Sequence, residues 1–129
     1  MRLLKAIAAT SVLLASVAAA AAVDHEAELQ QMLGKRVAGA PVNCINIHDI
    51  TGSHIVDGTA ILYDVVGGDI YVNRPQSGAY MLNRHQFLVM DTHVPQLCSV
   101  DHVDLVDGTT HMPSGTVGLG EFVPYRKVH

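Results

Sequence analysis

Alternating apolar and polar positions run through the chain beyond its first third and predict a mainly β protein. The two-residue period of a half-buried strand starts at Ile45 and Ile47, because successive side chains of a strand face opposite sides of a sheet. The strongest strand pattern covers residues 59–65, and the dipeptide Asp57-Gly58 before it is typical of a hairpin turn. Further strands are expected at residues 54–56, 69–73, 86–91, 102–106 and 117–125.

Turn-forming residues separate these segments. We expect a break at residues 51–53, Thr-Gly-Ser, a turn or short helical piece at residues 94–99, and a polar loop at residues 109–115. The last segment contains Gly118, Gly120 and Pro124, which suits a short closing strand at a sheet edge. About six or seven short strands with regularly spaced turns predict a small antiparallel barrel or sandwich.

A single short helix is expected before the β region, at residues 24–33. Asp24 is placed to cap its first turn and Gly34 to end it. Leu29, Met32 and Leu33 follow the i, i+3, i+4 spacing of one apolar helix face, so this helix is expected to dock rather than stand alone. Residues 34–43 are expected to form a connector.

Residues 1–22 have the pattern of a cleavable export signal. Arg2 and Lys5 precede a short apolar stretch, which runs into a series of alanines. A membrane anchor is the alternative, but residues 6–22 are short and only weakly apolar for a span. We therefore expect cleavage after Ala20 or Ala22. The chain is expected to divide into three parts: a signal peptide at residues 1–22, a helix and linker at 23–43, and a β domain at 44–129.

The charge balance narrows the classes of partner. The whole chain has a net charge of −4, and it becomes −6 without residues 1–22. A chain this acidic, with no cluster of Lys and Arg, does not have the electrostatic footprint of a nucleic-acid binder. We expect a periplasmic or secreted protein with no membrane span in its mature form and an unknown envelope or extracellular partner.

The two cysteines, Cys44 and Cys98, are expected to form a disulfide. An even number of cysteines in an exported protein is typical of a structural bridge, and the chain has no Cys-x-x-Cys redox motif. A bridge between these positions closes a long loop and stabilises the fold by about 4 kcal/mol in the chain-entropy model.

Several short segments, taken in order, resemble a family of small secreted proteobacterial proteins of unknown function. They are Cys44-Ile-x-Ile, residues 55–62, Tyr71-Val-Asn73, Leu97-Cys-Ser-Val-Asp101 and Gly118-Leu-Gly-Glu-Phe-Val-Pro124. The resemblance implies export and a small β domain. Members often have a second cysteine pair, which would fall near Ser77 and Val117 here. The family brings no known activity, catalytic residue or ligand.

A metal site is the main chemical alternative among the eight histidines of the chain. Residues i and i+2 of a strand share a face, so Asp91 can lie beside His93, and His102 beside Asp104. If the two segments are neighbours, these four side chains suit Zn²⁺ or Cu. Exposed polar residues on the solvated face of a sheet would produce the same spacing. We therefore predict no cofactor as the first interpretation and a periplasmic metal-binding protein as the second.

No catalytic motif is visible in the sequence. It has no Gly-x-Ser-x-Gly elbow and no Walker loop, and Ser53 and His54 are adjacent, hence on opposite faces of an extended chain. The first prediction is therefore a non-enzymatic binding or structural module. An enzyme whose site the sequence hides is the third prediction, and it requires a cleft with a histidine within hydrogen-bond reach of a serine or carboxylate.

Overall fold

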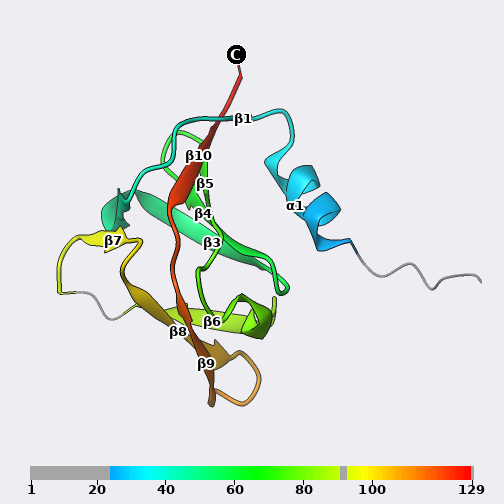
Figure 1. Ribbon diagram of the computed structural model, residues 1–129, viewed down its shortest axis with the longest axis vertical. Helices are drawn as coiled ribbons and strands as arrows, with labels where there is room; N and C mark the ends of the chain where they lie inside the picture. The colour runs from blue at the N-terminus through cyan, green and yellow to red at the C-terminus, as the bar shows by residue number, and fades with distance from the viewer. Residues whose placement is uncertain (1–23, 91–92, 129) are drawn as a thin grey trace, which may run out of the picture.

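The computed structural model describes residues 24–90 and 93–128. Within them the chain forms one α-helix, two short 3-10 helices and ten strands (Figure 1). The elements are α1 (His25–Leu33), β1 (Val37–Ala38), β2 (Cys44–Asn46), η1 (Ile47–Asp49), β3 (Ile50–Val56), β4 (Ala60–Val65), β5 (Ile70–Asn73), η2 (Ala79–Met81), β6 (Gln86–Val89), β7 (Gln96–Cys98), β8 (His102–Asp107), β9 (Pro113–Gly118) and β10 (Phe122–Arg126). No helix in this part of the chain has the length and hydropathy of a membrane-spanning segment.

The strands form three antiparallel sheets. The largest has the order β1-β10-β5-β4-β3, a three-stranded sheet has the order β6-β8-β9, and β2 pairs with β7 alone. The mainly β class and the single N-terminal helix are confirmed. None of these sheets closes into a barrel, and the described ranges hold ten strands rather than the six or seven expected. The expected signal peptide lies outside the described residues.

Strand β4 lies between β5 and β3, and its first four residues are buried on both faces of the five-stranded sheet. On one face Ala60 and Leu62 meet Leu29 and Leu33 of α1, which lies over this side of the sheet (Figure 1). On the other face Ile61 and Tyr63 join the core formed with the smaller sheets. That core contains Ile45, Leu82, Leu97, Val103, Leu105, Val117, Leu119 and Phe122. Residues 60–63 are therefore all apolar, because neither face of this part of the strand reaches solvent.

Helix α1 begins and ends where the sequence predicts. The Asp24 carboxylate accepts hydrogen bonds from the backbone N–H groups of Glu26 and Ala27, at 3.1 and 3.2 Å. Gly34 follows the helix with φ +61°, a conformation that glycine adopts without steric cost. The buried Leu29 and Leu33 hold the helix against the sheet, as the apolar spacing indicates.

Four local expectations are wrong. β3 runs through residues 51–53, and its register shifts at a bulge where Thr51 stands between the paired residues Ile50 and Gly52. Residues 94–99 contain strand β7, and β9 begins inside the expected loop at 109–115. The expected connector at 34–43 contains β1.

The segment at 117–125 is not one closing strand at a sheet edge. It is divided between β9 and β10, and β10 lies between β1 and β5. Pro124 is tolerated there although it lacks an N–H donor. Its carbonyl still accepts a hydrogen bond of 2.7 Å from the backbone N–H of Gly39.

The disulfide prediction is confirmed. Cys44 and Cys98 are bonded and stand directly opposite each other on β2 and β7, with Cα atoms 4.0 Å apart. The backbone N–H of Ser99 extends the ladder by donating to the carbonyl of Asn43 at 2.7 Å. The bridge therefore fastens two short strands that would be marginal as an isolated pair.

A buried amide fastens the loop between β9 and β10. Asn73 is completely buried at the end of β5. Its side chain donates to the carbonyl of Gly120 at 2.7 Å and accepts from the Gly120 N–H at 3.0 Å. A Cβ at Gly120 would collide with the carbonyl oxygen of Arg74, so only glycine fits this close approach.

Candidate functional site: a groove between two strand edges

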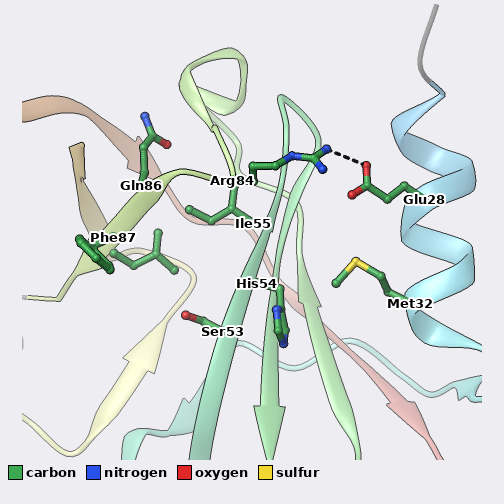
Figure 2. Close-up of a pocket in the computed structure, with 9 residues that line it drawn as sticks. Glu28, Met32, Ser53, His54, Ile55, Arg84, Gln86 and Phe87 are labelled. Carbon is green, nitrogen blue, oxygen red and sulfur yellow. Dashed lines mark hydrogen bonds and ion pairs between the residues drawn. The ribbon is translucent and has the colours of Figure 1, made fainter. Parts of the chain in front are cut away.

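A groove of about 470 Å³ lies between α1, β3 and β6 (Figure 2). It is larger than the hollows beside the disulfide and beside His102, each of about 310 Å³. Three elements and one loop contribute its lining, which consists of Glu28, Met32, Ser53, His54, Ile55, Arg84, Gln86, Phe87 and Leu88.

Both strands that line the groove are edge strands. Within residues 24–90 and 93–128, β3 ends the five-stranded sheet and pairs only with β4, and β6 ends the three-stranded sheet and pairs only with β8. In the described part of the chain, the backbone groups of residues 53–55 and 87–89 make no hydrogen bond outside these two ladders. One side of each strand therefore presents unused N–H and C=O groups towards the groove.

The β3 edge lacks the usual protection against pairing with another chain. Natural edges are shortened, bulged or supplied with charged residues and proline. β3 has seven residues, none of them proline, lysine, arginine or an acid, and its bulge lies at the far end, next to Ile50. Residues 53–55 thus form a regular edge beside the groove, without lysine, arginine, acid or proline.

Arg84 closes one end of the groove by joining three segments. Its backbone N–H donates to Asp57 Oδ1 at 2.7 Å, and its guanidinium lies 3.2 Å from both Asp57 Oδ2 and Glu28 Oε2. Figure 2 shows the Arg84 side chain reaching across to Glu28 on α1. Each exposed ion pair contributes little stability, so these contacts mark the point where the helix, the β3–β4 turn and the start of β6 meet.

The same contacts shift the ionisation of Asp57. Partial burial acts to raise the pKa of its carboxyl, but the hydrogen bonds and charge of Arg84 outweigh burial and hold this pKa below its usual value. Asp57 is therefore a fixed negative charge at neutral pH. It stands beside Glu28, so the Arg84 charge is shared between two acids.

The groove also contains a histidine paired with a carboxylate. His54 Nε2 lies 3.0 Å from Asp64 Oδ2 on the neighbouring strand. Ser53 and His54 are directed to opposite sides of β3 (Figure 2), as expected for adjacent residues of a strand. Among the described residues, no hydroxyl or thiol is hydrogen-bonded to His54. This contact meets the geometric requirement stated above for a hidden enzyme, a histidine of a cleft within reach of a carboxylate. The pair is nevertheless only half of a hydrolytic constellation, because no nucleophile is bound to its base.

The four residues predicted to bind a metal are placed as follows. His102 begins β8, and Asp104 two positions later accepts a hydrogen bond of 2.9 Å from the Thr116 hydroxyl. His93 lies before β7, and Asp91 lies outside the described residues. In residues 24–90 and 93–128, no three His, Cys, Asp or Glu side chains gather closely enough to hold a metal ion. The four-residue site stays a prediction.

A second polar hollow lies beside His102, next to the turn that precedes β8. Ser77, Ser99, Asp101 and His102 line it. The Asp101 carboxylate is engaged by the backbone N–H of Cys98 at 2.7 Å, and no hydrogen bond joins His102 to a serine among the described residues. The residue types of a catalytic Ser-His-Asp triad are present here, but their contacts are those of a capped turn.

Tyr63 carries the one buried side-chain polar atom without a hydrogen-bond partner in the described residues. Burial raises the pKa of its hydroxyl. The ring packs against Phe122 with centroids 5.9 Å apart, deep in the core shared by the sheets. Tyr63 does not line the groove, and its position is explained by packing.

Sequence reasoning did not single out the groove. Its residues come from segments far apart in the chain, and no local spacing connects Glu28, His54 and Arg84. One signal was present in β6 and its next residue, where Phe87, Leu88, Val89 and Met90 form an uninterrupted apolar run. Such a run is typical of a strand buried on both faces, whereas Phe87 is 58% exposed and Val89 45% exposed.

Comparison of the chain with protein-family models, with curated proteins and with solved structures gives no match. The resemblance to small secreted proteobacterial proteins therefore stays a prediction, and the function has to be argued from the groove itself.

Proposed function

We propose that this protein is an exported, disulfide-bonded β module that binds a partner in the periplasm or outside the cell through the β3–β6 groove and catalyses no reaction. Two lines of argument support export. Residues 1–22 have the pattern of a signal peptide. The Cys44–Cys98 bridge is of a kind that persists in oxidising compartments.

The observation that carries the binding role is the pair of unpaired strand edges around one groove. A protein that only needs stability gains nothing from two open edges, since each is a template for unwanted pairing. The surroundings are also held in place, because the buried side chains of Leu29 and Leu33 hold α1 against the five-stranded sheet. A rigid frame lowers the entropy cost of binding.

The proposal of a non-catalytic role rests on the contacts of the polar residues. His54 is paired with Asp64, and Asp101 with the backbone of Cys98. Neither arrangement sets a nucleophile against a general base, which acyl transfer by a side chain requires. The groove therefore supplies surface, charge and backbone groups for recognition.

The export half of the proposal is tested by expressing the whole chain in a bacterial host and measuring the intact mass of the periplasmic protein. We expect loss of residues 1–20 or 1–22 and a mass two hydrogens below that of the reduced chain. Retention of the leader or of free thiols in the periplasmic protein would contradict export as proposed.

The binding half is tested by titrating the purified, oxidised, ¹⁵N-labelled protein with a library of small organic fragments and following its amide resonances. We expect hits to shift amides of residues 53–55 and 86–88. Hits confined to other surfaces, such as the hollow beside His102, would contradict the groove as the binding site. The same titration with Zn²⁺ tests the alternative metal function through the amides of His93, His102 and Asp104.

A further inference from the structure

We infer that the occupant of the groove is an extended polypeptide segment of another protein, neutral or basic in charge, that lies between β3 and β6 and pairs with both. This inference rests on the proposed function, because it names the class of partner for the same groove. It is carried by the backbone edges, by the side chains on either side of the groove, and by the charges around it.

The backbone edges argue for an extended chain. A β-strand has N–H and C=O groups along both sides, so one strand can satisfy two edges at once. β3 and β6 are edges of two separate sheets, and both line the same groove. A segment between them would join the five-stranded and three-stranded sheets into one, the mode of recognition known as β-strand addition. A helix has no backbone groups left for either edge.

The length of the lining sets the size of the segment. Three consecutive residues of β3 and three of β6 contribute to the groove, residues 53–55 and 86–88. A strand rises about 3.3 Å per residue, so the paired region corresponds to about three or four residues of the partner. The Arg84 contacts with Asp57 and Glu28 bound one end of it.

The side chains of the groove argue for an alternating partner sequence. Ile55 and Leu88 are partly buried and pack against the core between the sheets. Phe87 precedes Leu88 in β6 by one position, so its exposed ring lies on the opposite face of that strand, and Met32 of α1 also lines the groove. Successive side chains of an inserted strand face these two sides in turn. An apolar residue is therefore expected where the segment covers Ile55 and Leu88.

The charges argue against an acidic segment. Glu28, Asp57 and Asp64 surround the groove, and Arg84 is its one permanently positive side chain in the described residues. Arg84 is already engaged by two of these acids. With the histidines neutral, the frame has a surplus of two negative charges, so an acidic partner would meet like charges in a partly desolvated site. A lysine or arginine near Glu28 or Asp64 would be favoured.

The experiment uses a phage-displayed library of random ten-residue peptides, selected on the whole exported protein with its disulfide formed. We expect enrichment of neutral or basic sequences with alternating apolar positions. Two variants control the selection. Phe87→Ser removes an exposed apolar side chain of the groove, and Val100→Ser removes one that is 81% exposed outside it. Enriched peptides should bind Phe87→Ser at least tenfold more weakly than Val100→Ser.

Backbone pairing is tested on an enriched peptide made by synthesis. N-methylation of alternate amides removes the hydrogen-bond donors of one edge and leaves the other edge intact. We expect both alternate sets of N-methyl groups to weaken binding at least tenfold, because the segment pairs with β3 on one side and β6 on the other. Amide hydrogen exchange should slow at residues of both strands. Tolerance of either methylated set would overturn the two-edge model.

Failure of this inference is separable from failure of the proposed function. If organic fragments bind in the groove and no peptide is enriched over the Phe87→Ser control, the partner is not a polypeptide strand and the binding role stands. If neither probe binds in the groove, both fail. Enrichment of mainly acidic peptides would overturn the charge argument. A dimer seen by analytical ultracentrifugation, with its contacts at residues 53–55, would replace the separate partner by a second copy.

Discussion

Two places in the molecule bring distant segments of the chain face to face, and they are built in opposite ways. At one, β2 and β7 are hydrogen-bonded in register and joined by the Cys44–Cys98 disulfide, across 54 positions of sequence. At the other, β3 and β6 line one groove without pairing. We call these the closed junction and the open junction.

The difference between the two junctions separates stability from recognition. The closed junction uses the backbone groups that β2 and β7 turn towards each other in its own ladder, and its inner residues Ile45 and Leu97 are buried in the core. The open junction leaves its edges to water, with an exposed Phe87 beside them. We therefore expect changes at the closed junction to alter the free energy of unfolding, and changes at the open junction to alter binding.

The largest expected effect is removal of the disulfide. The double variant Cys44→Ser, Cys98→Ser should lower the free energy of unfolding by about 4 kcal/mol, because the unfolded chain regains the entropy of a long open loop. A domain of this size has a total of about 5–15 kcal/mol. Urea unfolding followed by far-UV circular dichroism at pH 7 measures the change.

Wild-type protein in the presence of a reductant is the control for this variant, since it loses the same bond without a change of side chain. Both should unfold at a similar urea concentration. A loss below about 1 kcal/mol in both samples would show that the β2–β7 pairing does not depend on the bridge.

The second effect concerns Asn73, which pins the loop between the three-stranded and five-stranded sheets. Asn73→Ala leaves the buried N–H and C=O of Gly120 without their partners, and should cost about 2–3 kcal/mol in the same unfolding assay. Asn83→Ala is the matched control, because the Asn83 side chain accepts a hydrogen bond from His85 at an exposed turn. Equal losses in the two variants would contradict a special role for the buried amide.

A third and much smaller effect is expected at the open junction. Phe87→Ser removes a ring that is 58% exposed, so the free energy of unfolding should change by no more than about 0.5 kcal/mol. Thermal and urea unfolding of the variant beside wild type check this. A loss of 2 kcal/mol or more, on the order of that for a buried aromatic side chain, would show that Phe87 is part of the core and that the groove is not open.

The contrast between the junctions also explains how far the sequence alone can go. The disulfide of the closed junction follows from the even number of cysteines, and β4 follows from the apolar run in its own short segment. Strand β7 was missed because Pro95 suggested a break, yet the proline stands just before the strand, where its carbonyl accepts a hydrogen bond from the Ile47 N–H at 3.0 Å. Gly52 also suggested a break in the strand, but it stands next to a bulge inside β3 and not at the end of a strand.

The open junction could not be predicted for a different reason. A strand is an edge when no other strand pairs with one of its sides. This depends on the rest of the fold, so it cannot be inferred from the residues of β3 alone. His54 and Asp64 were both visible as polar residues, but only the β3–β4 register brings Nε2 and Oδ2 to 3.0 Å. Arg84 carries no motif at all. Its role depends on the helix and the hairpin turn meeting beside it.

The smallest expected effect is the pH dependence contributed by Asp57 at the end of the groove. Its pKa is lower in the folded protein than in the unfolded chain, where it is near 3.8. The ionised form thus stabilises the fold above that pH, and this contribution is lost as the pH falls through the folded-state pKa. Because the pair with Arg84 is near the surface, this contribution to the free energy of unfolding is at most about 1 kcal/mol.

The variant Asp57→Asn tests this contribution, because it keeps an oxygen for the Arg84 N–H and removes the charge. Urea unfolding of this variant from pH 6 to pH 2 should show a smaller decline in stability than wild type, and an identical decline would mean that Arg84 does not hold the carboxylate in solution.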